Sequence, residues 1–88
     1  MRIKESFVLQ DIMDDFIVVP IGEDADRMNG VIKLNETSAF LWKLLADGDQ
    51  TEDDLSAALM KEYSVHFSTA QRDVSIFIDK LKNIGCIV

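Results

Sequence analysis

Cysteine, proline and long apolar runs are all scarce in this 88-residue chain. The single cysteine, Cys86, excludes an internal disulfide, and a metal site would have to combine it with His66 and carboxylates without any paired spacing. No apolar run approaches the roughly 20 residues that cross a membrane. Residues 1–5 contain two basic side chains, but no apolar segment with a cleavage site follows them. We therefore expect a cytoplasmic protein without a membrane partner.

Positive charge is also in short supply. Sixteen acidic residues face nine basic ones, which gives a net charge of −7, and residues 11–54 hold twelve of the acids against three basic residues. Nucleic-acid binding draws much of its affinity from neutralising phosphates. The charge balance therefore predicts no nucleic-acid partner, and the acids are expected to form a solvated surface.

Catalytic patterns are missing as well. The chain has no nucleophile beside a base, no Gly-rich phosphate loop, no zinc spacing and no dinucleotide fingerprint. The acidic pairs Asp14-Asp15 and Asp53-Asp54 fall at an expected turn and an expected helix start, where acids are favoured locally. We predict that the protein is not an enzyme and needs neither a metal nor an organic cofactor.

What the chain does have is enough apolar surface for one small domain spanning residues 1–88, since 48% of its residues are hydrophobic. Alternating and β-branched segments predict strands over residues 6–12, 16–21 and 31–34, with a turn at Asp14-Asp15. Pro20 is expected at a strand end because it cannot donate to a ladder. Residues 22–30 are predicted to form a polar loop closing on Asn29-Gly30.

Three helices are predicted after these strands. The first covers residues 36–46 behind an Asn35 cap, the second opens at a Thr51–Asp54 capping box, and the third opens at Ser68 with Gln71 in the matching position. Three strands followed by three helices define a small winged-helix-like α+β domain. Its core is expected to contain Phe40 or Trp42, together with Leu55, Leu59, Val74, Phe77, Ile78, Leu81 and Ile84.

Two surfaces could receive a partner. Ile76 falls opposite the core stripe of the last helix. Strand 31–34, if it lies at a sheet edge, has unpaired N–H and C=O groups that can take an added strand.

The order of short motifs in residues 31–88 resembles the PqqD-like family, which contains small peptide chaperones of the pyrroloquinoline quinone pathway and related systems that modify ribosomal peptides. The matching motifs are Leu34-Asn35-Glu36-Thr37 with Trp42, Asp47-Gly48, Thr51-Glu52-Asp53-Asp54-Leu55, Leu59 and Tyr63, Asp73-Val74, Phe77-Ile78, Leu81 and Gly85. The resemblance implies a recognition domain that binds the leader segment of a precursor peptide as an added strand. It also implies a partner that modifies the peptide, often a radical S-adenosylmethionine enzyme.

Carried over by position, the resemblance places the edge strand at Val31, Ile32, Lys33 and Leu34 and the helical wall at Gln71, Val74, Ser75, Ile78, Asp79 and Lys82. The loop at 22–30 is long for the family, so the exposure of the edge strand is left open. Two alternatives also stay open. One is a winged helix that binds DNA, and the other is a structural or dimerisation subunit, such as a homodimer, without a peptide ligand.

Overall fold

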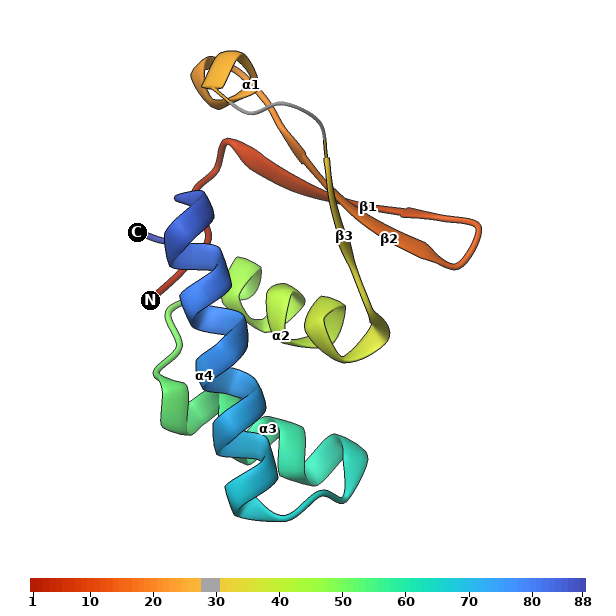
Figure 1. Ribbon diagram of the computed structural model, residues 1–88, viewed down its shortest axis with the longest axis vertical. Helices are drawn as coiled ribbons and strands as arrows, with labels where there is room; N and C mark the ends of the chain where they lie inside the picture. The colour runs from red at the N-terminus through yellow and green to blue at the C-terminus, as the bar shows by residue number, and fades with distance from the viewer. Residues whose placement is uncertain (28–30) are drawn as a thin grey trace.

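The fold is a three-stranded antiparallel sheet followed by a group of helices (Figure 1). A computed structural model describes residues 1–27 and 31–88. The elements are β1 (Phe7–Ile12), β2 (Asp15–Pro20), α1 (Glu23–Arg27), β3 (Ile32–Leu34), α2 (Glu36–Asp47), α3 (Glu52–Tyr63) and α4 (Phe67–Ile84). The predicted winged-helix-like α+β class is confirmed. None of the helices in the described residues is long and apolar enough to cross a membrane.

Strands β1 and β2 form a tight hairpin. Their register runs from Phe7 opposite Pro20 to Ile12 opposite Asp15, so the turn consists of Met13 and Asp14. Both turn residues have positive φ, 48° and 70°, as a two-residue type I′ turn requires. The turn was predicted at Asp14-Asp15, one residue too late, because the acidic pair is the stronger local turn signal.

Strand β3 pairs only with β2, in the sheet order β1-β2-β3. Within the described residues it is therefore an edge strand, as the addition of a further strand requires. The strand itself covers Ile32 to Leu34, so Val31 precedes it instead of opening it.

The predicted polar loop at 22–30 contains a short helix, α1, which the sequence pattern did not predict. Three acids lie in its first turn, where they suit the helix dipole, and the Ser6 hydroxyl donates to the Asp24 carboxylate. Gly22 precedes the helix with φ of 64°. The predicted Asn29-Gly30 turn lies outside the described residues.

The caps of α2 and α3 are as predicted. The Asn35 side chain accepts from the Ser38 N–H at 2.8 Å. The Thr51 hydroxyl accepts from the Asp54 N–H and the Asp54 carboxylate accepts from the Thr51 N–H, both at 3.0 Å. Hydrogen bonding to Thr51, chiefly from its backbone, lowers the pKa of Asp54, so this contribution to stability is present above the carboxyl's ordinary pKa and is lost as the pH falls.

The predicted start of the last helix is wrong. Helix α4 begins at Phe67 behind His66, and within the described chain no side chain caps it, so the Ser68–Gln71 capping box does not form. Helix α3 ends at Tyr63 and is capped by Ser64, whose φ is 53° and whose N–H donates to the Met60 carbonyl. This left-handed residue turns the chain sharply. Helix α4 therefore starts one residue before Ser68, where the Ser68–Gln71 pattern had placed the cap.

The core lies between the sheet and the helices. Trp42 is buried whereas Phe40 is only half-buried, which settles the alternative between them. The other predicted core side chains are buried except Ile84, which is half-buried against the cluster. The two termini lie together (Figure 1), where Ile3 bridges to Ile87 and the Lys4 N–H donates to the Cys86 carbonyl at 2.8 Å.

Cys86 is buried, as expected for a small hydrophobic residue, and its thiol should be unreactive in the folded protein. Burial, helped by the Asp24 carboxylate, raises the pKa of the Cys86 thiol to about 11. Because the thiolate is the nucleophile, reaction with a disulfide reagent at pH 8 should be at least about a hundredfold slower in buffer than in 8 M urea. Equal rates in the two solutions would contradict the buried position.

Candidate functional site

The outer edge of β3 presents free backbone groups. The Ile21 N–H donates to the Ser6 carbonyl at 2.7 Å, and alternation along the ladder makes Ile12 opposite Asp15 a hydrogen-bonded pair as well. The backbone groups of Phe16 and Val18 therefore point to β3, where they meet Leu34 and Ile32. The N–H and C=O groups of the intervening Lys33 point away from β2, toward the open edge.

The predicted edge-strand side chains divide between two faces. Leu34 is buried and Ile32 is half-buried, and both pack against the core. Val31 is 60% exposed. The exposed Lys33 side chain pairs with the Asp15 carboxylate of β2, with a distance of 3.2 Å from Nζ to Oδ1. One face of β3 is therefore packed against the core, and the other face is exposed.

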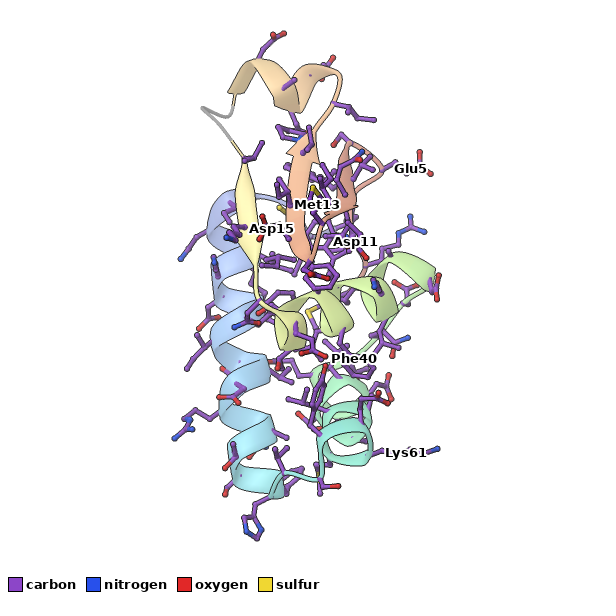
Figure 2. The ribbon with its side chains drawn as sticks, turned by 90° about the vertical axis from the view of Figure 1, so that its right-hand side faces the viewer. Glu5, Asp11, Met13, Asp15, Phe40 and Lys61 are labelled. Carbon is purple, nitrogen blue, oxygen red and sulfur yellow. The ribbon has the colours of Figure 1, made fainter. Side chains whose placement is uncertain are left out.

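A groove of about 330 Å³ begins where β3 ends. One wall is the start of α2, and the other is one flank of α4, with the lining residues Asn35, Thr37, Ser38, Leu41, Asp73, Ile76, Phe77 and Lys80. In Figure 2, β3 lies between α4 and β2, so its free edge faces the side of α4. The groove combines apolar side chains, which are Leu41, Ile76 and Phe77, with a polar and charged rim.

The predicted helical wall does not coincide with this groove. Val74 and Ile78 are fully buried in the core, so they do not present a surface to a ligand. The other four predicted residues are exposed, but none lines the groove: Gln71, Ser75, Asp79 and Lys82.

The predicted wall and the groove lining lie on opposite flanks of α4. At about 100° per residue, Gln71, Ser75 and Lys82 share one border of the core stripe, and Asp73 and Lys80 share the other. The structure turns the second border toward the start of α2. The spacing of Asp73, Ile76, Phe77 and Lys80 places all four on one side of a helix, but the same spacing argument applies to the opposite border, so the sequence does not choose between the two.

A second hollow, of about 480 Å³, lies on the hairpin side of Asn35. Its lining is mostly charged, with Asp11, Asp14 and Asp15 from the hairpin and Glu36 from α2. In the described residues no three His, Cys, Asp or Glu side chains are placed to hold a metal ion. The two hollows therefore differ in character, since one is partly apolar and the other is acidic.

The fold and the groove define a small α+β domain of the winged-helix-like class with an open strand edge beside a helix. The chain belongs to the PqqD family, since the family profile, described as coenzyme PQQ synthesis protein D (PqqD), matches residues 16–87. No curated protein matches the chain.

Two solved structures have a similar fold. One is TbiB1 in complex with the TbiA(beta) leader peptide, which is 24% identical with a TM-score of 0.79 over 98% of this chain and 93% of that one. The other is lasso peptide synthetase B1 complexed with the leader peptide, also 24% identical, with a TM-score of 0.73 over 97% of this chain and 93% of that one.

Proposed function

We propose that this protein is a non-catalytic peptide chaperone that binds the leader segment of a ribosomally made precursor peptide. It would present that peptide, in the cytoplasm, to a modifying enzyme, and a radical S-adenosylmethionine enzyme is the class that the family resemblance suggests. Membership of the PqqD family supports the proposal. The leader peptides bound to the two proteins of similar fold support it as well.

The observation that carries the proposal is the free edge of β3 next to the groove. An added strand gains affinity from main-chain hydrogen bonds and specificity from pockets for alternate side chains. Lys33 would supply the central N–H and C=O pair of such a ladder. Side chains on one face of the added strand would then enter the groove between α2 and α4.

The groove determines which leader side chains fit. Buried Leu41 and Phe77 and exposed Ile76 suit an apolar side chain, while Asp73 and Lys80 can bind polar groups of the flanking residues. The eight lining side chains include hydroxyl groups but no histidine or cysteine. This composition suits recognition of a peptide, which is why the proposal assigns the domain no catalytic step.

The two flanks of α4 provide a matched test of the groove. Ile76→Arg should weaken leader binding at least tenfold, because Ile76 lines the groove and a charged side chain there would displace the apolar contact. Ser75→Arg, one residue away on the exposed opposite flank, should leave the affinity within about twofold. Both can be measured by fluorescence anisotropy with a labelled leader peptide from the cognate precursor.

Backbone amide shifts provide the map for the same titration. We expect the shifts to cluster at residues 31–35 and 73–80 when the cognate leader is added to labelled protein. If Ser75→Arg weakens leader binding and Ile76→Arg does not, the leader binds the flank of α4 that was predicted from the sequence. Shifts confined to α1, or no binding at all, would contradict the proposed function.

A further inference from the structure

We propose that the outer face of the sheet is the docking surface for the modifying enzyme. This inference rests on the proposed function, because it assigns a second surface to a protein that presents a peptide. The outer sheet face contains the apolar side chains of Val8, Ile12, Ile17, Val19 and Val31 and the polar ones of Gln10, Asp15 and Lys33, with Met13 at the hairpin tip.

Strand register separates this face from the core. Directly opposite residues point to the same side of an antiparallel sheet. Phe7, Val18 and Leu34 are buried on the inner side, so their neighbours along each strand point outward. Val8 lies opposite Val19, and Ile17 lies opposite Lys33, which places these four side chains on the outer face.

The outer sheet face is mostly apolar, although solvent would favour polar residues there, and its charged pair is Lys33 with Asp15. An antiparallel sheet with one face on the core normally shows polar side chains on the other. Of the eight large hydrophobic side chains exposed in the described residues, five lie in or beside this sheet: Val8, Ile12, Met13, Ile21 and Val31. A concentration of this kind marks an interaction surface more than scattered single residues do.

The hairpin tip strengthens the argument. Met13 is 93% exposed and has a φ of 48°, a left-handed conformation that Asn or Gly adopts with less strain in this turn type. A flexible methionine suits a contact with another protein, because its thioether adapts to irregular surfaces. Figure 1 shows the hairpin extending away from the helices, and Figure 2 views its tip with Met13, Asp11 and Asp15 labelled.

Charge identifies the kind of occupant. Asp11, Asp14 and Asp15 lie at the hairpin end, where Lys33 pairs with Asp15, and exposed Glu23 and Asp26 lie on α1 beyond the other end of β2. A second copy would bring the same acids and the same net charge of −7 against this rim. The charges therefore fit a different protein, with an apolar surface edged by lysine or arginine.

Continuity with β3 identifies that protein as the modifying enzyme. A leader strand added to β3 extends the same sheet, so its outward side chains would lie beside Val31 and Lys33. An enzyme docked on the outer sheet face would contact the domain and the bound leader together. This arrangement lets the enzyme distinguish the loaded domain from the empty one.

The test compares two side chains of equal exposure. Ile12 on the outer sheet face and Phe67 at the start of α4 are each 51% exposed. With a candidate radical S-adenosylmethionine enzyme as the binding partner, Ile12→Lys should weaken binding to the leader-loaded domain at least tenfold, and Phe67→Lys should change it less than twofold. Ile12→Glu should weaken it less than Ile12→Lys does, because only lysine repels a basic rim.

Leader affinity, measured separately by anisotropy, keeps the two proposals apart. If the unsubstituted protein binds no leader, the proposed function fails. If it binds leader and Ile12→Lys binds both leader and enzyme normally, only the docking surface is wrong. Light scattering that shows a dimer dissociated by Ile12→Lys would assign the face to a second copy and would also overturn the inference.

Discussion

Phe77→Ala is expected to reduce the free energy of unfolding by about 3–5 kcal/mol, as large-to-small aromatic changes in a core do. Phe77 is only 5% exposed and belongs to the cluster formed by the sheet and the helices. Since stability is roughly 0.05–0.15 kcal/mol per residue, this loss is a large part of the total for a chain of 88 residues. Urea denaturation followed by far-UV circular dichroism would measure it.

The neighbouring residue provides the control. Ile76 is 62% exposed on the same helix, so Ile76→Ala should change the free energy of unfolding by no more than about 0.5 kcal/mol. Phe77→Leu, which retains most of the buried volume, should fall between the two. A midpoint for Phe77→Ala equal to that of the unsubstituted protein would show that the ring does not contribute to the core.

The sequence predicted those helix starts that depend on local bonds. At α2 and α3 a cap residue and an N–H three positions away satisfy each other, so a four-residue pattern is sufficient. At α4 the same type of pattern, Ser68 with Gln71, failed. The start there depends on Ser64 ending α3 in a left-handed conformation and on buried Ala70 packing in the core, and neither is a local property.

The flank of α4 that faces the groove was beyond the sequence for a similar reason. Both borders of the core stripe carry polar residues next to apolar ones. Helical periodicity therefore does not show which border faces the groove. Only the placement of α4 against Thr37 and Ser38 of α2 distinguishes Asp73 and Lys80 from the opposite border. The edge position of β3 was left open by the sequence as well, because three short strands can be ordered in more than one way, and it is the observed order β1-β2-β3 that places β3 at an edge.

Lys33→Pro should nearly abolish leader binding while leaving the fold intact. Proline removes the N–H that points to the open edge of β3, and an edge strand tolerates this loss because the bonds to β2 come from Ile32 and Leu34. The preceding Ile32 is already in an extended strand, as a residue before proline prefers. We expect at least a tenfold increase in the leader Kd, since strand addition depends on main-chain bonds.

Two variants make this result specific. Lys33→Ala removes the pair with Asp15 but keeps the N–H, and a surface ion pair contributes only about 0–1 kcal/mol, so leader affinity should stay within about threefold. Ile32→Pro removes a bond within the β2–β3 ladder and should lower the melting temperature, whereas Lys33→Pro should not. If Lys33→Pro binds leader as tightly as Lys33→Ala, the leader does not pair with β3, and recognition must depend on side chains of the groove alone.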